Sequence, residues 1–255
     1  MNFGLPILGR SGTIDVLEAL IRAQRHLAAP HGENMGRWVR ANKGFLVFLL
    51  CFGVFRTAVA DWNPIPSGSM RPNLLEGDVV FVNRLAYNVK VPLTDVVLAH
   101  IGEPQRGDVV TFSSPLDGTR LIKRLVAVPG DVVEMRDEVL FINGEAARYV
   151  APEALQETVA PGRTIGATRL TERVQGNERR VQWLHGIAAR SSFAPLVVPA
   201  GEYLMLGDNR DDSADSRYIG LVPRHLLIGR ALRILVSADI KHDWMPRLER
   251  FGQKL

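Results

Sequence analysis

Two serines in one short polar segment are the first residues that could do chemistry. Ser67 and Ser69 flank Gly68 within IPSGSMRPNLLEGD, residues 65–78. Glycine lets the backbone approach a substrate closely, and the prolines on both sides restrict the chain, so one hydroxyl can be held in a fixed exposed geometry. By composition alone, Ser-Gly-Ser is typical of an ordinary loop. A serine hydroxyl becomes a nucleophile only where a general base lies beside it.

One lysine within an apolar run is the candidate for that base. Lys123 interrupts the run LIKRLVAV, residues 121–128. In a strand, alternation places Leu121, Lys123 and Leu125 on one face. An amine among apolar neighbours loses hydration, which favours its neutral form and lets it act as a general base near neutral pH. The alternative from the residues alone is a lysine at the solvated edge of a sheet.

A polar cluster follows another apolar run. The segment GDNRDDSADSRY, residues 207–218, comes directly after the strand-like run 202–206. It could form a solvated loop or an acidic turn, but it lacks the calcium-loop spacing with a closing glutamate. The six histidines are scattered along the chain without an HExxH pattern. We therefore expect neither a metal nor another cofactor.

In this order, the three segments resemble the bacterial type I signal peptidases, also called leader peptidases. The family motifs are P-S-x-S-M-x-P-T-L, then a lysine followed by an arginine and a P-G-D turn, then G-D-N-R-x-x-S-x-D-S-R. All three are nearly intact here, with Asn73 where the family commonly has threonine. The resemblance extends to residues 244–247 and covers residues 1–43 and 145–200 only weakly.

The resemblance implies an endopeptidase that removes N-terminal signal peptides from exported preproteins after small residues at positions −1 and −3. It implies that Ser69 is the nucleophile, that Lys123 is the general base, and that Ser67 Oγ and the Ser69 backbone N–H form the oxyanion hole. Ser213 matches the family serine that orients the lysine. The supporting residues would be Arg124, Asp208, Arg210, Asp215 and Arg217. The substrate pockets would be lined by Ile65, Pro66, Met70, Leu74, Val80, Leu121 and Ile122.

Short apolar runs between turn signals predict the element types. They favour a mainly β fold, with an antiparallel sheet in a catalytic domain of residues 61–144 and 201–255. Asn143-Gly144 is a strong hairpin signal. Residues 145–200 have weak periodicity and indicate an inserted smaller subdomain or a long loop. Strands are expected at residues 78–83, 107–112, 121–128, 131–135, 139–142, 195–199, 202–206 and 228–236.

Residues 44–60 are a candidate membrane anchor. The uncharged stretch is short for a span, but Lys43 and Arg56 bracket it and long basic side chains can extend towards both interfaces. A single N-terminal transmembrane helix is expected, with the basic tail of residues 1–43 in the cytoplasm and the catalytic domain on the periplasmic face of the bacterial inner membrane.

Two sequence features near this anchor allow more than one interpretation. The apolar spacing at residues 14–21 fits an amphipathic helix on the membrane, and a partly ordered terminus fits equally well. The sequence Ala58-Val59-Ala60 followed by Asp61 looks like a signal peptidase site. We expect the segment to stay attached, because Ala60 lies too close to Ser69 along the chain to reach its own active site.

Composition limits the partners. The chain has 255 residues and a net charge of +4, but its basic residues form no run, so nucleic acid is not an expected partner. The expected partners are signal peptides and the phospholipid membrane, and we expect a monomer. Cys51 is the only cysteine, which excludes an intramolecular disulfide, and it is expected to be a small buried hydrophobe.

Other functions compete with signal peptide cleavage. A Ser-His-Asp hydrolase would need a G-x-S-x-G elbow and a histidine near the serines, and both are absent from the sequence. A peptidase of the same superfamily devoted to one client, such as pilin in conjugative transfer, is barely distinguished by the motifs. A non-enzymatic membrane-tethered β domain is opposed only by the Ser69 and Lys123 pair.

Overall fold

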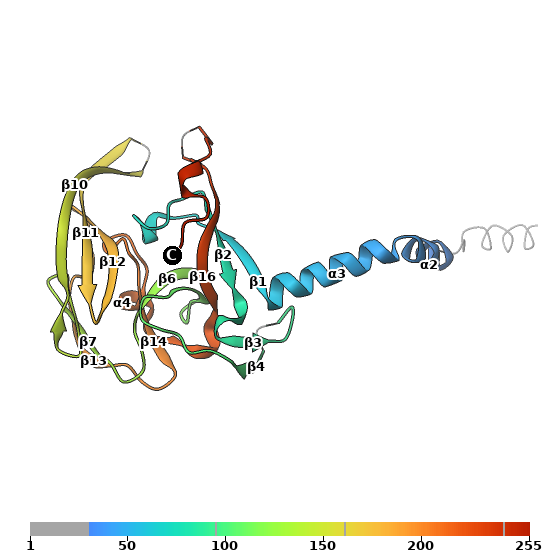
Figure 1. The fold of residues 1–255 in the computed structure, drawn as a ribbon, viewed down its shortest axis with the longest axis horizontal. Coiled ribbons are helices and arrows are strands. Elements are labelled where there is room, and N and C mark those ends of the chain that lie inside the picture. Colours follow the sequence, from blue (N-terminus) through green and yellow to red (C-terminus); the bar gives the residue numbers. More distant parts are fainter. Residues whose placement is uncertain (1–30, 95, 161, 242) are drawn as a thin grey trace, which may run out of the picture. The chain divides into compact units, whose positions relative to one another are not determined.

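The computed structural model describes residues 31–94, 96–160, 162–241 and 243–255 (Figure 1). The chain divides into two compact units, Met1–Phe52 and Gly53–Leu255. All the described strands lie in the second unit. The amphipathic helix expected at residues 14–21 and most of the basic tail lie outside the described residues.

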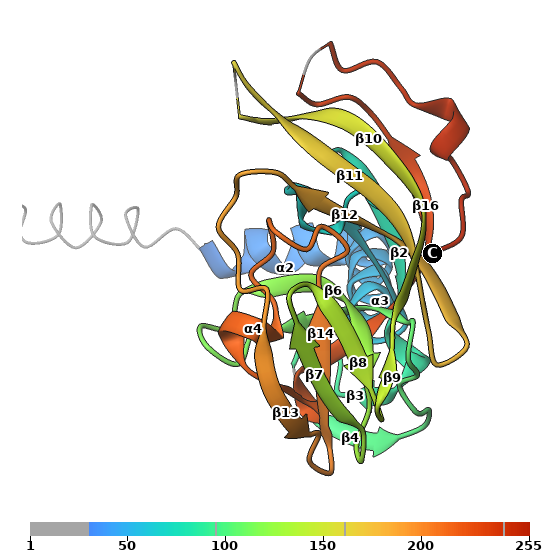
Figure 2. The same ribbon diagram turned by 90° about the vertical axis from the view of Figure 1, so that its left-hand side faces the viewer.

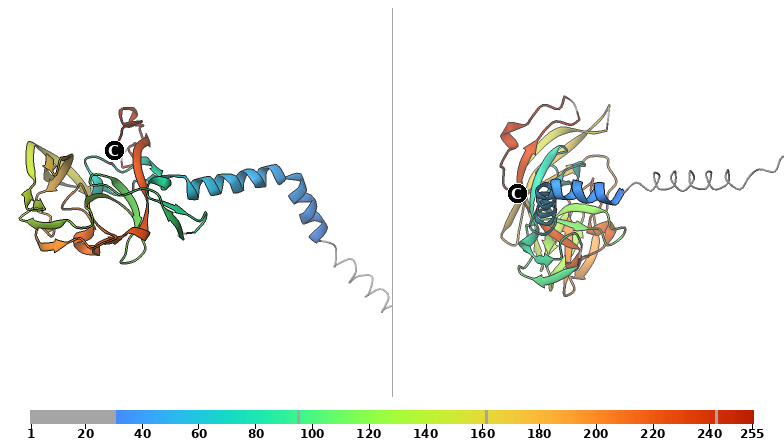
Figure 3. Two further views of the ribbon diagram at one scale, coloured as in Figure 1. Left: turned by 60° about the horizontal axis from the view of Figure 1, so that its bottom comes forward. Right: turned by 90° about the vertical axis from the view of Figure 1, so that its right-hand side faces the viewer.

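Two consecutive helices, α2 (His31–Ala41) and α3 (Lys43–Ala58), precede the strands. No described helix alone is long and apolar enough to cross a membrane. Residues Met35–Ala41 of α2 and Lys43–Ala58 of α3 meet the length and composition requirements together, with a bend of 72° between them (Figure 3). No residue of α3 is buried. Cys51 is therefore exposed on this helix, and the expectation that it is buried is wrong.

A seven-stranded sheet carries the lysine on one of its strands, and the segment with the two serines connects two others. Its strand order is β1-β2-β16-β5-β6-β14-β15, and every pair is antiparallel. This confirms the mainly antiparallel β fold. The strands are β1 (Ala60–Pro64), β2 (Asp78–Asn83), β5 (Val109–Ser113), β6 (Arg120–Ala127), β14 (Glu202–Leu206), β15 (Val222–Pro223) and β16 (Leu227–Ser237).

Residues 145–200 form strands rather than a long loop. β10 (Arg148–Ala160), β11 (Arg163–Val174) and β12 (Asn177–Leu184) make an antiparallel sheet whose first two strands form a long ribbon (Figure 2). A separate four-stranded sheet has the order β13-β7-β8-β9. Its strands are β7 (Val132–Arg136), β8 (Val139–Ile142), β9 (Glu145–Ala146) and β13 (Phe193–Val197).

The remaining elements are short. Asn143 and Gly144 have φ of 53° and 80°, and they turn β8 into β9 as the hairpin signal predicts. β3 (Asn88–Lys90) and β4 (Val97–His100) form a two-stranded ribbon, and α4 (Ser216–Ile219) follows β14. The 3₁₀ helices are η1 (Gly68–Met70), η2 (Arg84–Ala86), η3 (Arg224–Leu226) and η4 (Leu248–Arg250).

One of three apolar clusters supports the serine segment. Met70 and Leu74 lie in it with Val80 of β2 and Ile234 of β16, and all four side chains are fully buried. Burial of a large apolar side chain stabilises the folded state by about 1.5–3 kcal/mol. The turn that carries Ser69 is thus fixed to the sheet by the two apolar residues that follow the serine.

Candidate active site

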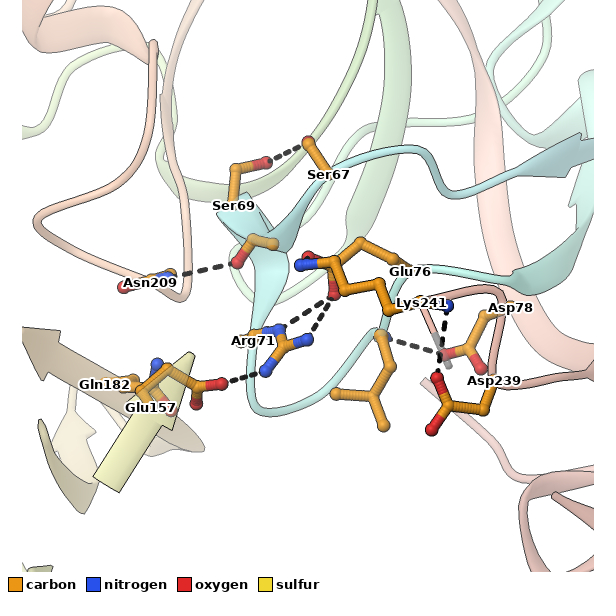
Figure 4. A network of polar contacts seen from close by, with 12 residues as sticks. Ser67, Ser69, Arg71, Glu76, Asp78, Glu157, Gln182, Asn209, Asp239 and Lys241 are labelled. Atoms are coloured by element: carbon orange, nitrogen blue, oxygen red, sulfur yellow. Dashed lines mark hydrogen bonds and ion pairs between the residues drawn. The ribbon is translucent and has the colours of Figure 1, made fainter. Parts of the chain in front are cut away.

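Ser69 lies in η1, in the turn that Met70 anchors. The loop after β14 holds this turn from the other side: Asn209 donates from its backbone N to the Ser69 carbonyl oxygen at 3.1 Å and from Nδ2 to the Gly68 carbonyl oxygen at 3.1 Å (Figure 4). Ser69 is 8% exposed, so only a small part of the residue reaches solvent. Two elements far apart in the sequence therefore position the serine.

Lys123 lies on β6 opposite Val110 of β5, and only 3% of the residue is exposed. Its Nζ is 2.6 Å from Ser69 Oγ. Burial lowers the pKa of Lys123 to about 8, against the opposing effect of Asp215, Asp208 and Asp212. A neutral amine is thus accessible near neutral pH and lies within proton-transfer distance of a hydroxyl.

Ser67 supplies a second hydroxyl to the same place. Its Oγ lies 3.5 Å from Ser69 Oγ, and the residue itself is exposed. A hydroxyl here can donate to an oxygen atom that becomes negatively charged when Ser69 attacks a carbonyl. Figure 4 shows Ser67 and Ser69 pointing towards one another.

Charged residues of the third motif are buried in pairs. Arg124 of β6 donates to both carboxylate oxygens of Asp208, at 2.8 Å from Nε and 2.7 Å from Nη2. Arg217 makes the same two-pronged contact with Asp215 at 2.8 Å for both bonds, and Asp215 also accepts from the Gly207 backbone N. Such paired geometry holds a loop more rigidly than single contacts do.

Ser213 lies against the serine turn. A Cβ atom at Gly207 would meet Ser213 Oγ at 2.2 Å and the Ser69 carbonyl oxygen at 2.7 Å, so only glycine fits between them. In the part of the chain that the structure describes, Ser213 Oγ is buried without a hydrogen-bond partner. Its expected hydrogen bond to Lys123 stays a prediction.

Sequence reasoning missed a buried carboxylate in the sheet of β10, β11 and β12, which we call the inserted sheet. Glu172 of β11 is fully buried, 2.6 Å from Arg210 Nη1, and it also pairs with Arg179 and accepts from the Tyr149 hydroxyl at 2.8 Å. Burial raises its pKa, but Arg210 and Arg179 outweigh this and lower it to about 2. The weak periodicity of residues 145–200 contained no signal for this partner.

Most expected pocket residues gather beside Ser69. Ile65, Met70, Leu74 and Val80 share one cluster, with Ile122 packed against it. Leu121 instead packs against a different cluster, around Phe112 and Met205. Pro66 is exposed, and it lines with Ile65 an apolar groove of about 580 Å³ that Val236 and Trp244 also border.

The chain is similar in sequence to known proteins. A family model described as "Signal peptidase, peptidase S26" matches residues 36–236, which include Ser69, Lys123 and Ser213. Signal peptidase I of Pseudomonas fluorescens is 36% identical over 228 residues, covering 84% of this chain and 78% of that protein. Signal peptidase I of Pseudomonas aeruginosa is 35% identical over 230 residues, with the same coverage, and that of Rickettsia massiliae is 31% identical over 232 residues, covering 81% and 83%.

Proposed function

This chain belongs to the signal peptidase family, peptidase S26, and on that basis we propose that it removes signal peptides from exported preproteins with Ser69 as nucleophile and Lys123 as general base. Membership makes it a serine peptidase of signal peptide processing. The observation that carries the residue assignment is the contact of 2.6 Å between Lys123 Nζ and Ser69 Oγ at a buried position.

The reaction follows from these positions. Neutral Lys123 takes the proton from Ser69 Oγ, and Oγ attacks the carbonyl carbon of the scissile bond. The Ser69 backbone N–H and the Ser67 hydroxyl donate to the resulting oxyanion. The Lys123 ammonium then gives its proton to the leaving amine as the C–N bond breaks. Water, deprotonated by the same lysine, hydrolyses the ester and frees Ser69.

Small residues at positions −1 and −3 fit the surface beside this pair. Met70, Leu74 and Val80 have no exposed surface, so they back the wall and leave little depth next to the nucleophile. Ile122, which is partly exposed and packs against the same cluster, is placed to contact a substrate side chain, and Ile65, although only 2% exposed, borders the apolar groove. A shallow apolar wall admits alanine and excludes larger groups.

We also place a membrane anchor at residues 44–60, with the tail of residues 1–43 in the cytoplasm and a monomeric catalytic unit on the outer face of the bacterial inner membrane. α3 is apolar and has no buried residue, as expected of a helix surrounded by lipid. The Arg56 guanidinium lies 4.4 Å above the Trp62 ring, and these two residue types suit the membrane interface.

The test uses the purified full chain in detergent and a panel of preproteins, with each cut located by mass spectrometry. Ser69→Ala is expected to abolish cleavage. Ser67→Ala is expected to lower kcat by about a hundred- to a thousandfold, because one oxyanion donor is lost while the nucleophile remains. Cleavage at an unchanged rate by folded Ser69→Ala would contradict the assignment of the nucleophile.

A further inference from the structure

Arg71 is a charged residue next to the nucleophile turn for which the proposed reaction has no role. It caps η1, and its backbone N donates to the Gly68 carbonyl oxygen at 3.0 Å. Its guanidinium binds Glu76 Oε2, at 2.8 Å from Nε and 2.7 Å from Nη2, and it binds Glu157 of β10 through Nη1 (Figure 4). Both carboxylate residues are buried.

The ion pair of Arg71 with Glu76 packs against Gly68 in the turn that carries Ser69. A Cβ atom at Gly68 would lie 3.1 Å from Glu76 Oε1 and 3.3 Å from Arg71 Cδ, so these side chains fill the space that a larger residue at position 68 would need. Lys241 Nζ lies 2.5 Å from Glu76 Oε1. Burial raises the pKa of Glu76, but Lys241 and Arg71 outweigh this and leave it lowered, so the carboxylate is charged at neutral pH.

Glu157 links Arg71 to the inserted sheet. Its second oxygen, Oε2, accepts from Arg169 Nη2 of β11 at 3.2 Å. Arg169 Nε in turn donates to Gln182 Oε1 of β12 at 2.9 Å. One chain of side-chain contacts therefore crosses all three strands of the sheet.

The same chain of contacts returns to the nucleophile. The Gln182 backbone N donates to the Asp208 carbonyl oxygen at 2.9 Å. The next residue, Asn209, forms a bridge with Gln182 and donates to the carbonyl oxygens of Gly68 and Ser69. The nucleophile turn is thus part of a closed ring of contacts, held through Arg71 at one end and through Asn209 at the other.

We propose that Arg71 is a positioning residue for Ser69 and that the inserted sheet, through Glu157, sets the orientation of the nucleophile turn. The proposal rests on the proposed function and gives the insertion a role in it. A displacement of about 1 Å at a reacting group can cost on the order of a hundredfold in rate. Both carboxylates that bind Arg71 are buried. Removal of one of their charges leaves the Arg71 guanidinium without a full set of partners, so its side chain can take another position.

The test compares two glutamates of the same strand. Glu157→Gln keeps the shape and removes the charge, and we expect kcat to fall by about ten- to a hundredfold while KM stays nearly constant. Glu153→Gln is the matched control: Glu153 also lies on β10, but its ion pair with Arg180, at 2.7 Å, is exposed. We expect the control to keep the wild-type kcat.

A double-mutant comparison separates positioning from general stability. If Arg71 acts through Glu157, the variant with both Arg71→Met and Glu157→Gln is no slower than Arg71→Met alone. The pH of half-maximal activity should not move, because Lys123 is untouched. Should Glu157→Gln lower the yield of folded protein, Arg71→Lys tests the same point, because it keeps the charge but not the forked geometry.

Three results would overturn the proposal: a wild-type kcat in Glu157→Gln, independent multiplicative losses in the double variant, or a fall in kcat that only tracks the folded fraction measured by thermal unfolding. Wild type and Ser69→Ala are assayed in parallel. A wild-type chain that cleaves no preprotein would remove the proposed function and this inference together. Cleavage by wild type with unimpaired Glu157→Gln would remove this inference alone.

Discussion

Burial and nearby carboxylates act on Lys123 in opposite directions. The carboxylates of Asp215, Asp208 and Asp212 favour its charged form, yet burial is the larger effect and the pKa falls to about 8. Asp215 and Asp208 each carry an arginine partner, Arg217 and Arg124, which offsets much of their charge. The ion pairs of the third motif therefore help to keep the amine neutral as well as holding the loop in place.

This balance predicts how activity depends on pH. Only the neutral amine can accept the Ser69 proton, so kcat/KM should rise about tenfold per pH unit below pH 8 and level off above it. The measurement is kcat/KM for one preprotein between pH 6 and pH 10, with and without EDTA as a control for metal dependence. A plateau reached only above pH 10, where an exposed lysine loses its proton, would contradict a buried base.

The same pKa predicts that the base costs stability. Below about pH 8 the folded protein must hold a buried charged amine, whereas the unfolded chain keeps the ordinary pKa of 10.5; the cost is about 3 kcal/mol at pH 7 and disappears as the pH approaches 10.5. Lys123→Met should abolish cleavage and unfold at a higher temperature than wild type at pH 7. The difference in Tm should shrink at pH 10, and a lower Tm of the variant at pH 7 would contradict the argument.

Strands could be predicted from the sequence where one face of the strand is buried, and they could not be predicted where both faces are largely exposed. In β2 the residues Asp78, Val80 and Val82 are buried in alternation, and the predicted range of this strand is the observed one. β10 has 13 residues, of which only Glu157 is buried, so it shows no such alternation. It is held by pairing with β11 and by long-range ion pairs, and neither leaves a periodic signal in the sequence.

The structure of β1 bears on whether the enzyme could cut its own chain. Ala60, which would be the −1 residue, is 4% exposed and begins a strand paired with β2 over five residues. Asp61, which would be the +1 residue, is buried and within 3.1 Å of Arg120 Nη1 and 3.5 Å of Arg84 Nη1. A protease needs an extended, unpaired substrate, and this bond is tied into the sheet.

We therefore predict that protein purified from its native host keeps the segment before Asp61. N-terminal sequencing and intact mass of the membrane-extracted protein give the measurement. The matched control is a preprotein with the same Ala-Val-Ala-Asp sequence after an unstructured spacer, which should be cut. A mature amino terminus at Asp61 would show that strand pairing does not protect this bond.

At the scale of the whole molecule, the three short motifs predicted residues that the structure brings together, because each motif is a loop or strand whose side chains meet at one place. Ser69, Lys123 and Asn209 come from separate parts of the sequence, and the sheet order that joins β2, β16, β5, β6 and β14 brings them together. The contact of Arg71 with Glu157 and that of Arg210 with Glu172, both glutamates of the inserted sheet, were not predictable. They join residues 86 and 38 positions apart, and the spacing of charges along a chain does not specify such pairs.

The last prediction follows from the division of the chain into two units. Every residue assigned to the reaction lies in Gly53–Leu255, so a chain reduced to this unit should cleave a soluble signal-peptide mimic with the kcat of the full chain. The full chain should remain with membranes after carbonate extraction, because α3 presents apolar side chains on all sides. The shorter chain should be released by carbonate, since the apolar residues exposed on its surface, such as Leu98 and Trp244, give at most peripheral binding. Release of the full chain by carbonate would contradict the membrane anchor. A lower kcat in the shorter chain, with its fold intact by circular dichroism, would show that the helices contribute to the reaction itself.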